Sequence, residues 1–410
     1  MRRRVINALD IARQMIQTIE EMGAVVDEPA TQANGVGVLF RGKVVAETAM
    51  LLLCVEPIQH LDERIRKQAK AIAKILISYA RHEDVLAAIC LDPGRACDYG
   101  VAHAILSHLG FPDINVDNLL SKSLTMGSDF GPERLPHQKL GQAWLARVWG
   151  VFEAPSRNDA DLVADSMIGR CLDALGSTRL DIYAFTHAVM YASDFGMRRI
   201  SRVRAPLEIA ADADAALAQS LDANDFDLTA EIALTWPMLG LPWSPGALFA
   251  FSILTDVEDR VGFLPGLAFD SNRHLSLMGE ERSRFALATS YHASYVMGFL
   301  CAAALREDRT PPAKVLPIGR TQGASSVLLQ LIGAESSTSC WREAIGVLPP
   351  RQQDSLSPLL LGILLRRART YGNLTLVRDA LEVALEFDLI DGPAPTQAAA
   401  LLRRSQVFKL

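Results

Sequence analysis

Apolar residues recur every three to four positions along most of this chain, which is the spacing of one face of an α-helix. Such stripes occupy residues 6–19, 65–79 and 162–175. Alternation of apolar and polar residues, which is typical of a half-buried strand, is rare. Residues 35–45 show it, and they predict either a small hairpin or an extended entry into the next helix. The pattern as a whole predicts an all-α protein.

Breaks that contain Gly or Pro separate the predicted helices at intervals of roughly twenty to thirty residues, which suits helix pairs joined by short loops. No Gly/Ser-rich linker divides the chain. We therefore expect sequential helix pairs that form an α/α toroid or a curved helical array. Its parts are an N-terminal helical part (1–120), a central helical region with the candidate site (121–306) and C-terminal helical pairs that complete the same fold (307–410).

Composition limits the class of protein. The chain has 410 residues, of which 50% are hydrophobic and 21% charged, so a large core is expected and wholesale disorder is not. The net charge of -6 argues against a general nucleic-acid binder, which needs a basic surface. No apolar signal-peptide core follows the basic residues 1–4, and the apolar residues 46–55 are too few to span a bilayer. We expect a cytoplasmic protein that binds neither nucleic acid nor membrane.

The most informative segment is 183–196, in which three polar side chains interrupt an apolar helical stretch. His187, Tyr191 and Asp194 are spaced by four and three residues, which predicts that an imidazole, a phenol and a carboxylate share one helix face. Gly196 is expected to end this helix in a left-handed conformation. Asp194 then lies in the last turn, at the negative end of the helix dipole, where a carboxylate needs a cation or a hydrogen-bond donor.

A second polar group opens another apolar helix, in residues 291–298, and contains His292 and Tyr295. If both helices face an internal cavity, His187, Asp194, His292 and Tyr295 form a metal site or an acid–base set. A single histidine on an apolar helix is more often a hydrogen-bonded structural residue, which is the alternative. The sequence identifies no metal and no other cofactor.

Two further acidic groups invite a functional interpretation. Asp256, Glu258 and Asp259 have carboxylate spacing that binds magnesium in isoprenoid enzymes, but the second acidic motif of those enzymes is missing, and a solvated, capped loop is the preferred interpretation. Asp212 and Asp214 are interpreted as residues on a helix surface. No hydrolase elbow or dinucleotide-binding loop is present.

Four groups of residues carry a resemblance to a known family: 133–137 with 142–145, 186–196, 235–239 and 291–298. They resemble an uncharacterised family of bacterial all-helical proteins that is carried as a domain of unknown function and is often found near natural-product biosynthesis genes. The loops at 262–265 and 391–393 are similar to inter-helix loops of α/α toroids, the fold of terpene cyclases, prenyltransferases and lanthionine cyclases. This second resemblance implies an active site in a central cavity.

These observations lead to two expected functions. The first is a natural-product biosynthetic enzyme that binds a small-molecule or peptide substrate in a helical cavity. This substrate is an apolar or peptide-like intermediate of the pathway. The enzyme performs acid–base or metal-assisted cyclisation or elimination, with His187 as base or ligand, Tyr191 as acid, Asp194 as orienting partner, and His292 with Tyr295 completing the site. The alternative is a non-catalytic helical scaffold or partner-binding protein.

Overall fold

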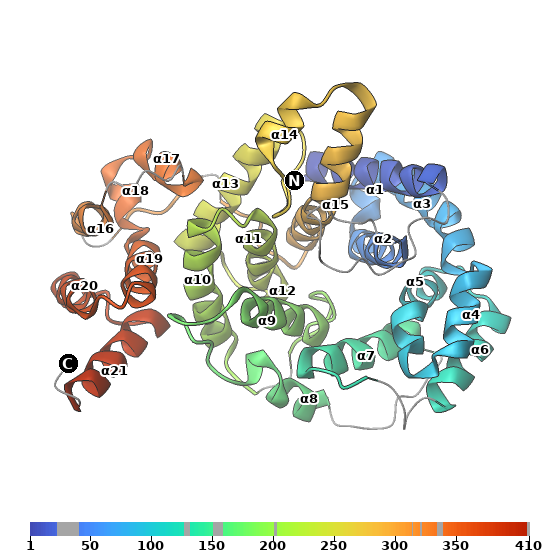
Figure 1. The fold of residues 1–410 in the computed structure, drawn as a ribbon, viewed down its shortest axis with the longest axis horizontal. Helices are drawn as coiled ribbons and strands as arrows, with labels where there is room; N and C mark the ends of the chain where they lie inside the picture. Colours follow the sequence, from blue (N-terminus) through green and yellow to red (C-terminus); the bar gives the residue numbers. More distant parts are fainter. Residues whose placement is uncertain are drawn as a thin grey trace.

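Every regular element in the described part of the chain is a helix (Figure 1). The computed structural model describes residues 1–22, 41–126, 132–150, 159–200, 203–313, 315–319, 322–333 and 339–407. No strand occurs in these ranges, so the prediction of an all-α protein is confirmed. Residues 41–45 of the segment with strand-like alternation are helical, whereas residues 35–40 lie outside the described ranges.

The first fifteen α-helices occupy the right-hand and central parts of Figure 1. Their bounds are α1 (Arg2–Met22), α2 (Arg41–Val55), α3 (Glu63–Ala80), α4 (Glu83–Leu91), α5 (Ala96–His108), α6 (Ile114–Met126), α7 (Pro136–Trp149), α8 (Asp159–Asp165), α9 (Arg179–Ala192), α10 (Pro206–Asp222), α11 (Phe226–Ala233), α12 (Thr235–Leu239), α13 (Pro245–Val261), α14 (Ser271–Ser276) and α15 (Gly279–Ala304). Short 3-10 helices are η2 (Glu56–Leu61), η3 (Pro93–Arg95) and η4 (Met167–Gly169).

Six of these helices contact one another in a closed order. Helix α2 packs on α5, α5 on α7, α7 on α9, α9 on α11, α11 on α15, and α15 returns to α2. Helix α1 lies along α15, although the two are far apart in sequence (Figure 1). The two helices approach closely at Gly298, where an added Cβ would lie only 2.6 Å from the Cβ of Ala8.

Buried ion pairs also fasten α1 to the end of α13. Arg4 is 8% exposed, and its guanidinium pairs with both Glu258 and Asp259. Asn7 donates a second hydrogen bond to Glu258, at 2.8 Å. The interpretation of these carboxylates as a solvated loop is therefore wrong for Glu258, which is 5% exposed. Glu258 and Asp259 hold α1 against α13, which lies more than two hundred residues later in the chain.

The remaining helices lie beyond α10 and α13, at the left of Figure 1. They are α16 (Ala324–Ile332), α17 (Cys340–Gly346), α18 (Pro350–Asp354), α19 (Ser357–Thr370), α20 (Leu374–Glu386) and α21 (Pro393–Val407). Helices α19 and α21 pack on α10. The division of the chain into three parts stays a prediction.

Two carboxylates of α10 also differ from the prediction. Asp212 is 1% exposed and accepts a hydrogen bond from Arg204 at 2.7 Å. Asp214 accepts one from the hydroxyl of Ser244 at 2.5 Å and lines a cavity between α10 and the C-terminal helices. Both were interpreted as helix-surface residues. That interpretation is wrong for Asp212, which also accepts a hydrogen bond from the amide of Leu172, and Asp214 is partly buried beside α19.

One stretch, residues 41–61, is long and apolar enough to cross a membrane, and half of it is buried inside the fold. Its buried side chains, which include Val44, Leu51 and Leu52, belong to the same hydrophobic core as those of the other helices. The core thus accounts for the apolar character of α2. The absence of a membrane partner stays a prediction.

Candidate acid–base site

The site is organised by α11, whose residues are almost all buried. The side chain of Asp225 caps this helix by accepting a hydrogen bond from the amide of Leu228 at 3.1 Å. Asp227 and Glu231 follow with a spacing of four residues, so both carboxylates lie on one helix face. That face meets α9 and α15. Asp227 is 9% exposed and Glu231 is 2% exposed, so each needs charged or hydrogen-bonding partners.

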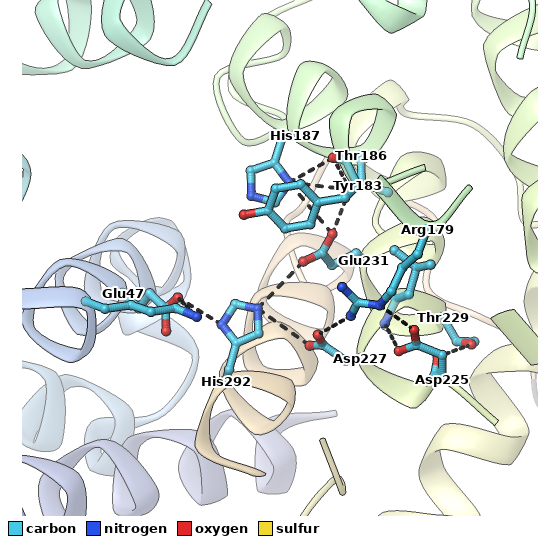
Figure 2. Close-up of polar contacts among 12 residues, drawn as sticks. Glu47, Arg179, Tyr183, Thr186, His187, Asp225, Asp227, Thr229, Glu231 and His292 are labelled. Atoms are coloured by element: carbon cyan, nitrogen blue, oxygen red, sulfur yellow. Dashed lines mark hydrogen bonds and ion pairs between the residues drawn. The ribbon is translucent and has the colours of Figure 1, made fainter. Parts of the chain in front are cut away.

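His292 of α15 lies between carboxylates on both sides of its ring (Figure 2). Its Nδ1 is 3.0 Å from Oε1 of Glu47 on α2. Its Nε2 is 3.6 Å from Oδ1 of Asp227 and 3.7 Å from Oε1 of Glu231. Two helices that are distant in sequence, α2 and α11, therefore bring three carboxylates to one imidazole of α15.

The pKa values of these groups follow from their mutual charges. Burial by itself lowers the pKa of His292, but the carboxylates of Glu47 and Asp227 outweigh it and raise that pKa well above the usual value. Burial acts to raise the pKa of both Glu47 and Glu231. The pKa of Glu47 is nevertheless below its usual value because of His292, and that of Glu231 is below its usual value because of His187 and His292. For Asp227, burial raises the pKa to about 6. His292 is therefore a cation that balances carboxylates at neutral pH.

His187 of α9 approaches the same group from the other side of Glu231. Its Nδ1 lies 3.0 Å from the carbonyl oxygen of Tyr183 and 3.8 Å from Oε2 of Glu231. Since a carbonyl only accepts hydrogen bonds, Nδ1 carries the proton, and Nε2 of the neutral ring keeps its lone pair. Burial lowers the pKa of His187, which favours this neutral form. We call Glu47, His187, Asp227, Glu231 and His292 the carboxylate–histidine cluster.

A cavity of about 280 Å³ adjoins His187. Aromatic side chains form part of its wall: Tyr183 and His187 stack with ring centroids 3.8 Å apart, and Tyr191 lies edge-on to His187 at 5.8 Å. Burial raises the pKa of both Tyr183 and Tyr191, so both phenols keep their protons at neutral pH and are able to donate hydrogen bonds. His137 of α7 and Asp98 of α5 also line this cavity.

The predicted site residues fall into two groups. His187, Tyr191 and His292 lie at the cluster or the adjoining cavity. Asp194 does not lie in the last turn of α9 as expected, because the helix ends at Ala192 and Asp194 itself has a φ of 54°. Its carboxylate accepts a hydrogen bond from the indole of Trp144 at 2.7 Å. The expectation that it shares a face with His187 is therefore wrong.

The hydroxyl of Tyr295 contacts a residue next to the cluster and no member of it. The side chain of Tyr295 is fully buried, and its hydroxyl forms a hydrogen bond with the hydroxyl of Thr48 at 3.1 Å, which joins α15 to α2. This contact makes Tyr295 a packing residue of the helix interface. Sequence reasoning missed Glu47, Asp227 and Glu231, although two carboxylates four residues apart in the apolar segment 226–233 are a signal of the same kind as the histidines.

The fold and the site define an all-α protein with a buried cluster of carboxylates and histidines beside a cavity. The family described as a domain of unknown function, DUF6895, matches residues 12–302, and the chain belongs to this family. All residues of the carboxylate–histidine cluster lie within the matched part, whereas α16 to α21 lie outside it. No curated protein and no solved structure matches the chain.

Proposed function

We propose that this protein is an enzyme of acid–base chemistry whose substrate occupies the cavity beside His187, with that histidine as the general base. The observation that carries the proposal is the hydrogen bond from Nδ1 of His187 to the carbonyl of Tyr183. This contact fixes the ring and its tautomer, and it leaves Nε2 as the basic nitrogen. Among the described residues, Nε2 has no hydrogen-bond partner.

The neighbouring groups supply the other requirements of proton transfer. Glu231, 3.8 Å from Nδ1, stabilises the imidazolium that forms when Nε2 takes a proton from the substrate. The phenols of Tyr183 and Tyr191 remain protonated and are able to donate to an oxygen or nitrogen of the substrate that gains negative charge. Removal of a proton followed by loss of a leaving group is an elimination, and attack by the resulting nucleophile within one molecule is a cyclisation.

The size and lining of the cavity bear on the substrate. About 280 Å³ accommodates a small molecule or one part of a larger peptide. Met50 and Val101 supply apolar wall, and Gln142 and Asp98 supply polar groups. These features favour an apolar or peptide-like intermediate with a few polar atoms. A natural-product pathway in the cytoplasm of a bacterium is part of this proposal.

The closed order of contacts among α2, α5, α7, α9, α11 and α15 supports classification of this fold as an α/α toroid. In this architecture, side chains of the inner helices meet in the centre, where enzymes of this shape place their active sites. The cluster fits this description, because its members come from α2, α9, α11 and α15. The likeness in architecture supports an internal site and assigns no reaction by itself.

The test is a comparison of three proteins expressed at equal soluble levels in one bacterial host: the wild type, His187→Gln and His108→Gln. His108 is exposed, so its replacement is a matched control. Small molecules and peptides extracted from each culture are compared by mass spectrometry. We expect some compounds whose amounts change when the wild type or the control is expressed, and do not change when His187→Gln is expressed. Identical profiles for all three, together with proteins captured equally by the wild type and His187→Gln, would favour the scaffold function.

A further inference from the structure

Three ligand-type atoms of the carboxylate–histidine cluster converge on one point (Figure 2). They are Nε2 of His292, Oδ1 of Asp227 and Oε1 of Glu231, and all three lie within 4.8 Å of one another. The distances of 3.6 and 3.7 Å from Nε2 to the two oxygens exceed those of hydrogen bonds. Two ligands of one ion, each about 2.1 Å from the metal, lie roughly 3.0 to 3.4 Å apart. The observed spacing is thus closer to that of metal ligands.

The opposite atom of each residue is held by another side chain. Thr186 donates a hydrogen bond of 2.6 Å to Oε2 of Glu231, and Arg179 donates one of 3.3 Å to Oδ2 of Asp227. Glu47 pairs with Nδ1 of His292 at 3.0 Å. In each of the three residues, one atom therefore has a partner behind it, by a hydrogen bond in the two carboxylates and by an ion pair in His292, and the other faces the shared point. Metal ligands in proteins are oriented by such contacts, and a carboxylate behind a histidine is a common form.

A buried atom without a hydrogen bond supplies an independent observation. Oδ1 of Asp227 is inaccessible to solvent and accepts no hydrogen bond within the described part of the chain. Asp227 as a whole is 91% buried, since its exposure is 9%. A buried carboxylate oxygen in this state is costly unless a cation lies against it. Its position 3.6 Å from Nε2 of His292 directs it toward the same point as Glu231.

We propose that Asp227, Glu231 and His292 bind one divalent transition-metal ion, such as Zn²⁺ or Mn²⁺. Two carboxylates and one imidazole are ligands suited to these ions, and no cysteine belongs to the described cluster. Binding releases the proton of His292 from Nε2, and the metal ion then replaces the imidazolium as the charge that balances the carboxylates. Three protein ligands leave coordination positions for water or substrate. This inference deepens the proposed function and rests on it only for the role of the ion: beside His187, the ion polarises a substrate group while the histidine moves the proton.

The test measures metal binding without any substrate. Purified protein is stripped with a chelator and passed through a desalting column, and ZnCl₂ or MnCl₂ is then titrated in a calorimeter. Elemental analysis after a second desalting step gives the amount retained. We expect one ion per chain for the wild type and for His108→Gln, and none for Asp227→Asn, Glu231→Gln or His292→Gln. Glu47→Gln should weaken binding by about 10- to 100-fold, because it removes only the group behind His292.

Circular dichroism shows whether each variant is folded. Where a variant is unfolded, the titration of the wild type still shows whether the protein binds a metal ion. Failure of the stripped wild type to bind either ion would overturn the proposal, as would equal binding by folded Asp227→Asn and His292→Gln. X-ray absorption of the loaded protein should show oxygen and nitrogen ligands with one imidazole. His187→Gln should still bind the metal. Its failure to change the compounds in the culture extract therefore tests the proposed base separately from the metal site.

Discussion

Replacement of Asp214 by Asn should stabilise the protein, and the gain should grow with pH. Asp214 lies on α10, where its carboxylate accepts a hydrogen bond from Ser244 and lines a cavity shared with α19 and the segment before α21. Burial raises the pKa of this carboxyl group from 3.8 to about 7. Between these values the folded protein keeps a proton that the unfolded chain has released. Stability therefore falls as pH rises through this window and levels off above it.

The size of the effect follows from the two pKa values. Each pH unit between them is worth about 1.4 kcal/mol, so the ionisable group lowers the free energy of unfolding by up to about 4 kcal/mol at pH 8 and by less than half of that at pH 5. Asn has nearly the same shape, carries no charge, and its carbonyl oxygen still accepts from Ser244. Because water in the cavity reduces the cost of the charge, we expect Asp214→Asn to gain about 2 kcal/mol at pH 8.

Urea denaturation of the wild type and Asp214→Asn at pH 5 and pH 8 measures this difference. All other titrating groups are common to both proteins, so their contributions cancel when the two are compared at one pH. The control is Asp256→Asn, because Asp256 is an exposed aspartate of α13. Asp222 is not suitable as a control, because its carboxylate pairs with Arg367. Equal stability of Asp214→Asn and the wild type at pH 8, or a gain that is larger at pH 5, would refute the reasoning.

Three further predictions concern helix packing and the cluster. In metal-free protein, His292→Gln should lower the free energy of unfolding by about 3 kcal/mol, since it leaves buried carboxylates without their cation; urea denaturation with a chelator present measures it. Gly298→Val should lower Tm, at a cost of about 1 to 3 kcal/mol, because its side chain collides with Ala8; an unchanged melting curve would contradict the close helix approach. Tyr295→Phe should cost about 1 kcal/mol through the lost bond to Thr48, without any loss of metal binding in the calorimeter.

The helical architecture could be predicted from the chain because apolar stripes of helical period recur along most of it, although residues 170–175 of the stripe at 162–175 form no helix. Glycine ends helices in several of the breaks that contain Gly or Pro: Gly110, Gly240 and Gly262 all have positive φ at or just after a helix end. Gly196 also has a positive φ, but two non-glycine residues before it share this conformation, and they displace Asp194 from the helix. A local rule cannot predict such an extended left-handed segment, since contacts from distant parts of the chain hold it in place. One such contact is the hydrogen bond from Arg306 to the carbonyl of Phe195.

The site was harder to predict because its members come from separate helices. His187 and His292 stood out as polar residues on apolar helices, and the structure brings both to Glu231. Glu231 itself was missed, and so was the pairing of Glu47 with His292, because 245 positions separate these residues in the chain. Sequence periodicity tells which residues share a face of one helix. It does not tell which other helix that face will meet.

The cost of burying charge offers a general argument for a function at this cluster. A helix core is stable with apolar side chains alone, and replacement of buried ion pairs by well-packed apolar residues often leaves stability unchanged or increases it. Glu47, Asp227 and Glu231 nevertheless lie against one imidazole, although the helices that carry them are otherwise strongly apolar. The oxygens of Asp227 and Glu231 that face Nε2 of the imidazole lie beyond hydrogen-bond distance from it, while the other oxygen of each residue accepts a hydrogen bond from a neighbouring side chain. Stabilisation of the fold does not explain that asymmetry, whereas the binding of an ion explains both the spacing and the direction.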